Sequence, residues 1–261
     1  MIDAWIFGIV VVGGSVLFAS MGVLLVRKRV SGSWLKRHHE VAGYMLSIVG
    51  TLYSVLLGLI VVDTQTKYQN AKQMTQQEAD STLDLFHMAY TMPIETRKAM
   101  HESLAEYLRI VDEVEWDSID AHGFKDESAK VPFRKLWWTM TEYEPSTVRG
   151  TEAYSEMLQV LQDMTDGRRY RIQIAKTGMH EVMWGVVIFG GLLTVVFTFL
   201  FEVENVNAQL LMTGLVALAL SLNVLLIALF SNPYTGYMRI SSYPFKYDRK
   251  VILEMSKFKP E

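Results

Sequence analysis

Four long runs of apolar residues constrain the fold of this chain most. No charged residue occurs in residues 4–26, 41–62 or 182–201, and a fourth apolar run covers residues 210–230. Each run has about 20 residues, and a helix of that length spans the roughly 30 Å hydrocarbon core of a bilayer. The sequence therefore predicts an all-α integral membrane protein with four transmembrane helices in two hairpins.

The first apolar run is expected to stay in the protein as a transmembrane helix. A cleaved signal peptide has basic residues before a short apolar region. Here Asp3 precedes a long apolar run, and the basic residues follow it. The first hairpin is accordingly assigned to residues 1–62, with spans at about 4–26 and 41–62, and the second to residues 182–230, with spans at about 182–201 and 210–230.

The polar segment between the hairpins, residues 63–181, is predicted to be helical. Residues 63–91 contain neither Gly nor Pro, so the second span is expected to continue as one helix to about Tyr90. Further helices are expected from Pro93 to about Ile119, around residues 133–140, and from about Thr147 into the third span. Residues 231–261 are predicted to be a polar tail. The membrane helices thus extend into a polar helical bundle.

Basic residues give conflicting indications of orientation. Five lie in the loop between the first two spans, and ten lie in the approach to the third span and in the tail. Loops rich in Lys and Arg are usually cytoplasmic, but with four full spans these two groups lie on opposite sides of the membrane. The larger group favours a cytoplasmic polar domain.

Small residues recur along the second span at helical spacing. At about 100° per residue they fall on an arc of about 80° of one helix face. Close packing between helices explains such a stripe, because small residues let backbones approach in lipid. A pore wall also explains it, and the two can coexist in an oligomer. The stripe consists of Gly43, Ser47, Gly50, Ser54 and Gly58. The same face continues through Val61 to Gln65 and Lys72, so a pore along it would open from an apolar throat into a polar vestibule.

Two charged groups invite a structural and a functional interpretation. Lys36, Arg37, His38 and His39 form a basic cluster at the membrane edge, either an ordinary interfacial cluster or a group that senses pH or attracts anions. In the polar domain, Arg168 and Arg171 share a helix face and are expected to pair with acids on other helices; the candidates are Glu78 and Glu115. A buried ion-pair network is the first interpretation, and a ligand-sensing site is the alternative.

Catalysis, metals and cofactors are not indicated. The absence of cysteine excludes disulfides, thiolate metal sites and cysteine nucleophiles. His180-Glu181 lacks the rest of a zinc-protease motif, and no phosphate-binding glycine loop or G-x-S-x-G is present. The net charge of −3 gives no reason to expect a nucleic acid partner.

Several short motifs together resemble a known family. In order they are HHEVAGYMLSIVGTLYSVLLGLIVV from His38, QEA at Gln77, EW at Glu115, GRRYR at Gly167, Trp184, NPYTG at Asn232 and YPF at Tyr243. This pattern, from about Trp34 to Phe245, is similar to the bestrophin-like bacterial membrane proteins, which are related to bestrophins. Asn232 departs from the pattern, in which a His is expected before the Pro.

The resemblance implies an oligomeric anion channel with four spans per subunit, a helical cytoplasmic part and a pore lined by the second span. On this basis we expect a homo-oligomer in the inner membrane of a bacterial cell that conducts small inorganic anions passively. The alternative is a membrane-anchored sensor or scaffold whose helical domain binds a ligand or partner.

Overall fold

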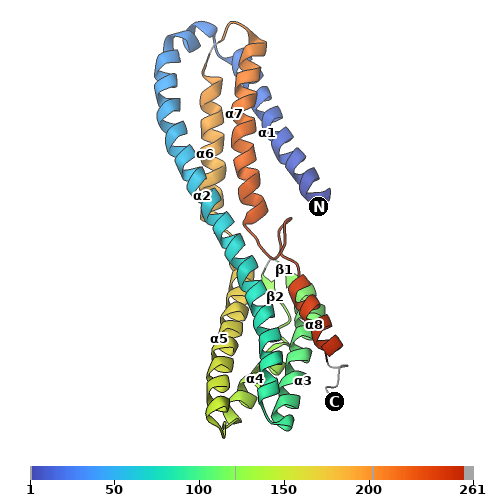
Figure 1. Ribbon diagram of the computed structural model, residues 1–261. Helices are drawn as coiled ribbons and strands as arrows, with labels where there is room; N and C mark the ends of the chain where they lie inside the picture. Colours follow the sequence, from blue (N-terminus) through green and yellow to red (C-terminus); the bar gives the residue numbers. More distant parts are fainter. Residues whose placement is uncertain (1, 121, 202, 256–261) are drawn as a thin grey trace. The chain divides into compact units, whose positions relative to one another are not determined.

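The computed structural model describes residues 2–120, 122–201 and 203–255. The chain divides into two compact units, each described here by itself (Figure 1). The membrane unit comprises the described residues up to Tyr68, together with Met179–Asn232 and Gly236–Met238. The polar unit comprises Gln69–Gly178, Pro233–Thr235 and the described residues from Arg239 onward.

The membrane unit contains four helices that are long and apolar enough to cross a bilayer. They are α1 (Ile2–Arg29), the first part of α2 (Gly32–Met88), α6 (Glu181–Phe199) and α7 (Val206–Phe230), which lie side by side in Figure 1. One cluster of buried residues joins α1, α6 and α7, and another joins α2, α6 and α7. The predicted all-α fold with four membrane helices is confirmed.

Helix α2 is continuous through both units, as the sequence predicted. It runs for 57 residues, and a short 3-10 turn, η1 (Ala89–Thr91), follows it. Gly58 is its last glycine and no proline occurs in it, so no residue with a low helix propensity interrupts its polar half. Pro93 then caps α3 (Ile94–Ile110), because proline fixes φ and lacks the N–H that a preceding turn would use.

Short irregular elements follow α3 in the polar unit. A π-helical turn, η2 (Val111–Glu115), and a 3-10 turn, η3 (Trp116–Ser118), lead into the antiparallel strands β1 (Ile119–Asp120) and β2 (Gly123–Phe124). Gly123 has a φ of 102°, a conformation that glycine adopts without strain. The sequence predicted a plain helix to about Ile119 and no strands, so this segment differs from the prediction.

Three further helices complete the polar unit: α4 (Lys130–Glu142), α5 (Val148–Lys176) and α8 (Tyr243–Met255). The predicted helix from Thr147 into the third span is wrong, because α5 ends at Lys176 and α6 starts only at Glu181. The backbone leaves the helical conformation at Thr177 (φ −114°, ψ 84°) and is extended at His180, and Gly178 between them lowers helix propensity by about 1 kcal/mol relative to alanine. The predicted polar tail contains α8, which packs on α3 and η2.

Candidate functional site

Helix α2 presents three different faces within the membrane unit. On the first, Tyr53, Leu57 and Ile60 are buried against α6 and α7. The second carries large exposed apolar side chains; they include Ile48, Leu52, Val55 and Leu59. The third is the small-residue stripe from Gly43 to Gly58, which lies about 100° around the helix from the buried face at 3.6 residues per turn.

The small-residue stripe has almost nothing packed against it among the described residues. A Cβ added at Gly50 or Gly58 meets no atom within 4 Å, and one at Gly43 meets only the ring of Phe201, at 3.7 Å. Ser54 is exposed, and its hydroxyl donates to the carbonyl of Thr51 in its own helix (2.9 Å). Ser47 is exposed as well. The stripe is therefore not explained by helix packing inside one chain.

Two glycines on α6 show what close packing looks like in the same unit. A Cβ on Gly190 would lie 2.4 Å from the ring of Tyr53, and one on Gly191 would lie 2.9 Å from the Tyr53 hydroxyl. That hydroxyl donates to the carbonyl of Val187. These glycines admit a large side chain from α2, whereas Gly50 and Gly58 of the stripe have no described atom within 4 Å of an added Cβ.

The remaining residues of the predicted axis lie in different surroundings. Val61 is half-buried and packs beside the Tyr53 cluster. Gln65 and Lys72 are exposed, and Lys72 makes no ion pair among the described residues. In the polar unit, Lys72 lines an open groove of about 590 Å³ with glutamines and with acids that the sequence analysis did not single out; the acids are Asp80, Asp84 and Asp163.

The predicted basic cluster lies in the first turns of α2, and all four of its side chains are exposed. The ring of His39 meets the ring of Phe201 edge-on at 5.0 Å, and His38 lies 4.3 Å from the ring of Trp34. None of the four residues forms an ion pair within the described chain. No set of three or more His, Asp or Glu residues in that part of the chain could hold a metal ion.

The four predicted network residues of the polar unit do lie together. Arg171 donates to both carboxylate oxygens of Glu78, from Nε and Nη2 at 2.7 Å each. Arg168 donates to both oxygens of Glu115, at 3.0 and 2.8 Å, and Arg171 Nη2 also reaches Glu115 at 3.3 Å. Two acids and two bases thus balance one another across α2, η2 and α5. Bidentate pairs of this kind are the strong class of ion pair.

Neighbouring groups complete this buried network. The hydroxyl of Tyr107 donates to Glu78, and burial, followed by the charge of Glu78, raises the pKa of that phenol. The backbone N–H of Ala129 donates to Glu115 at 3.1 Å. The guanidinium of Arg171 lies 4.8 Å from the ring centre of Phe124 and also faces two other rings, Trp116 and Phe245. The rings attract the guanidinium charge, and Nη1 of Arg171 has no hydrogen-bond partner among the described residues.

Gly167 lets α5 approach α2 closely enough to form these pairs. A Cβ at this position would lie 2.9 Å from the carbonyl oxygen of Met74 and 3.2 Å from Cα of Glu78. In the sequence analysis this glycine appears only as the first residue of the GRRYR motif. The structure shows that it is a packing site one residue from Arg168.

A buried carboxyl group on α8 was missed. Asp248 is 3% exposed and lies on the buried face of the helix between Phe245 and Ile252. Its Oδ2 has no hydrogen-bond partner among the described residues. Burial, with a contribution from the carboxylates of Asp80 and Asp84, raises its pKa to about 6. Phe245, Asp248 and Ile252 are spaced at i, i+3 and i+7. This spacing was the sequence signal that could have placed Asp248 on the buried face of a helix.

Comparison with known proteins agrees with this architecture. A bacterial bestrophin homologue from Klebsiella pneumoniae matches with a TM-score of 0.68 at 12% identity, over 94% of this chain and 98% of that chain. A mutant of a bacterial bestrophin homologue from Klebsiella pneumoniae matches with a TM-score of 0.72 at 8% identity, over 95% and 99% of the two chains. At such identities the likeness shows a shared fold. No curated protein matches the sequence.

The family model for the bestrophin-like domain matches residues 13–245. The match begins within α1, covers α2, α6 and α7, and extends to the first turn of α8. It also contains every motif on which the resemblance rested. The chain belongs to the bestrophin-like domain family.

Proposed function

We propose that this protein is a bestrophin-type ion channel in which several copies of the chain surround an axis lined by the small-residue stripe of α2. The observation that carries the proposal is the open space beside Gly50 and Gly58. Lipid contact favours large apolar residues, as on the neighbouring face with Leu52 and Leu59, whereas small residues leave room for a second helix or for water. Family membership supports the same function.

The permeant ions of the proposed channel are small inorganic anions. Lys72 supports this choice because it is exposed on the polar half of α2 and makes no ion pair in the described chain. The basic cluster at the start of α2 adds unpaired positive charge. Charged side chains near a pore favour ions of the opposite sign, and an apolar constriction such as a ring of Val61 gates by excluding water. In this proposal the channel lies in the bacterial inner membrane, and its polar unit lies in the cytoplasm.

Purified protein in planar bilayers under an asymmetric chloride gradient tests this proposal. The expected result is a conductance that reverses near the chloride equilibrium potential. Lys72→Gln should shift the reversal potential away from that value. Lys67→Gln is the matched control, because Lys67 lies about 140° around the helix from Lys72 and already pairs with Asp63 at 2.8 Å. Reversal at the cation potential would contradict the choice of anions, and absence of conductance would contradict the channel.

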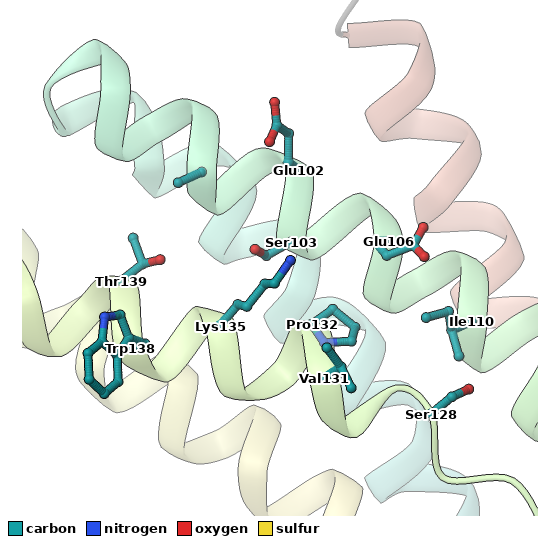
Figure 2. A pocket seen from close by; sticks show the side chains of 11 residues that line it. Glu102, Ser103, Glu106, Ile110, Ser128, Val131, Pro132, Lys135, Trp138 and Thr139 are labelled. Carbon is teal, nitrogen blue, oxygen red and sulfur yellow. The ribbon is translucent and has the colours of Figure 1, made fainter.

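A membrane-anchored sensor is the second candidate, and a groove on the polar unit favours it. The groove lies between α3 and α4 and has a volume of about 720 Å³ (Figure 2). Glu102 and Lys135 stand at its sides, and Trp138 is 65% exposed. Two results together would favour the sensor over the channel. The folded protein would not conduct, and a ligand would raise its stability in the parent chain but not in Trp138→Ala.

A further inference from the structure

Helix α8 is attached to the polar unit through a small buried face. Three of its 13 residues are buried: Phe245, Asp248 and Ile252. The helix packs on α3 and η2, and it lies beside α3 in Figure 1. A helix of this length is marginal by itself in water, so it depends on these contacts. One of its three buried side chains is a carboxyl group, which links the packing of α8 to the charge of that group.

The surroundings of Asp248 disfavour the ionised form of its carboxyl group. Asp248 is 3% exposed, and its Oδ2 has no hydrogen-bond partner among the described residues. Burial of a carboxylate without a hydrogen bond costs far more free energy than burial of a neutral carboxyl group. The carboxylates of Asp80 and Asp84 on α2 add repulsion, and the pKa of Asp248 is raised accordingly.

The charged groups of α3 and η2 beside α8 interact with Arg249 rather than with Asp248. Glu113 of η2 pairs with Arg249. Arg109 of α3 pairs with Glu113 and with Glu106, and the charge of Arg249 helps to lower the pKa of Glu106. Within the described chain no base forms an ion pair with Asp248. The other charged side chains of α8 are exposed; they are Lys246, Lys250 and Glu254.

The segment before α8 has a fixed point from which the helix can move. The backbone N–H of Ile240 donates to the carbonyl of Pro233 at 2.8 Å, and Ile240 is buried. Ser241 and Ser242 follow, and Ser241 is exposed. The chain can therefore remain anchored at Ile240 while α8 separates from α3 and η2.

We propose that α8 is a pH-sensitive element of the polar unit, which packs firmly while Asp248 is protonated and separates more readily once Asp248 is ionised. Phe245 on the same helix faces the guanidinium of Arg171 at 5.6 Å, and its ring centre lies 5.6 Å from that of Trp116. Separation of α8 removes this ring from the buried network and admits water beside Arg171. Acidification has the opposite effect and keeps the network covered.

The linkage between protonation and packing gives the sign and the size of the effect. The pKa of Asp248 is about 6 in the packed helix, compared with 3.8 for an ordinary aspartate. The packed form therefore binds the proton more tightly, and the equilibrium shifts towards separation as pH rises from about 4 to 6. The ratio of packed to separated α8 should fall about tenfold between pH 5 and pH 7.5.

Hydrogen–deuterium exchange of the full chain in mild detergent, followed by mass spectrometry at pH 5 and pH 7.5, tests the proposal. Dividing the chemical exchange rate at each pH by the observed rate gives a protection factor. In the parent chain the protection of residues 243–255 should fall about tenfold at the higher pH. At both pH values it should stay below that of the best protected amides of α3 and α5, because α8 separates without unfolding of the whole unit.

Two variants of α8 form a matched pair. Asp248→Asn should abolish the fall in protection, because an amide does not ionise. Glu254→Gln removes an exposed acid, which lies 3.8 Å from Lys250, from the same helix. This control should retain the tenfold fall of the parent chain.

Three results would overturn the proposal. One is equal protection of α8 at the two pH values in the parent chain, a result that requires no variant to fold. Another is a fall in protection that Asp248→Asn retains. The third is protection of α8 equal to that of α3 and α5 at both pH values, which would show that α8 separates only when the whole polar unit unfolds.

Discussion

Arg171 in the polar unit and Gly50 in the membrane unit both belong to patterns that stand out in the sequence, but their surroundings differ. Arg171 is fully buried, and its charge is matched by Glu78 and Glu115 within the same chain. A Cβ added at Gly50 meets no described atom within 4 Å. The buried ion pairs are complete within one copy of the chain, whereas the small-residue stripe is left largely uncovered by it.

This difference separates structural from functional roles. Buried ions are expensive to desolvate, so a chain that buries four of them must pair them all to remain folded. A chain can fold without packing anything against a small-residue face of a membrane helix. Such a face does not stabilise an isolated chain. We infer that the network of Glu78, Glu115, Arg168 and Arg171 holds the polar unit together, and that the stripe serves an assembly of several chains.

The largest effect on stability is expected for Arg171→Gln. The change leaves Glu78 buried without its partner, and the loss of one member of a buried pair costs about 3–5 kcal/mol. Thermal unfolding in mild detergent, followed by tryptophan fluorescence, measures it. Arg169→Gln is the control on the exposed face of the same helix, because Arg169 pairs with Asp166 at 3.6 Å in an exposed position and such pairs contribute about 1 kcal/mol or less. Equal losses of stability in both variants would show that the network does not hold the polar unit together.

A pair of glycine substitutions compares the two helix faces directly. Gly190→Val places carbon atoms where the ring of Tyr53 now lies, and overpacking of this kind costs about 1–3 kcal/mol. Gly50→Leu meets no atom of the described chain, so the melting temperature of the single chain should change little. It should instead reduce the oligomer seen by light scattering after size exclusion. If Gly50→Leu lowers the melting temperature as much as Gly190→Val does, the inferred difference between the two helix faces is wrong.

A smaller, pH-dependent effect is expected for Asp248→Asn. The pKa of this carboxyl is raised from 3.8 to about 6 in the fold, so the folded state holds the proton more tightly than the unfolded state. Stability therefore falls as pH rises from about 4 to 6 and stays lower above that range. The amide variant should be more stable than the parent at pH 7.5, by about 1–3 kcal/mol, and indistinguishable from it near pH 4. Melting curves at the two pH values measure this, and an equal gain at both would contradict it.

Much of this fold follows from local sequence signals. The four spans follow from uncharged length, and the continuity of α2 follows from the absence of Gly and Pro after Gly58. The pairing of Glu115 with Arg168 or Arg171 also follows, because charges in a helical bundle must find partners once they are buried. These features depend on composition and helical spacing alone.

Other features depend on tertiary contacts that spacing does not specify. The π-helical turn at Val111–Glu115 brings Glu115 to both Arg168 and the N–H of Ala129; no residue in this turn marks it as irregular. Helix α8 has 13 residues, too few for a stable isolated helix in water, and its buried face is provided by Phe245 and Ile252. The sequence does show an acid between these two residues, but not that its Oδ2 would have no hydrogen-bond partner among the described residues.

The central claim is that the stripe of α2 faces an axis shared by several copies of the chain. The chain has no cysteine, so a single Ser54→Cys variant in native membranes tests it, with Leu52→Cys as the control on the exposed apolar face. We predict that Ser54→Cys forms disulfide-linked dimers or reacts with a water-soluble thiol reagent, and that Leu52→Cys does neither. If Ser54→Cys stays monomeric and unreactive, or if both variants behave alike, the stripe does not face a shared axis.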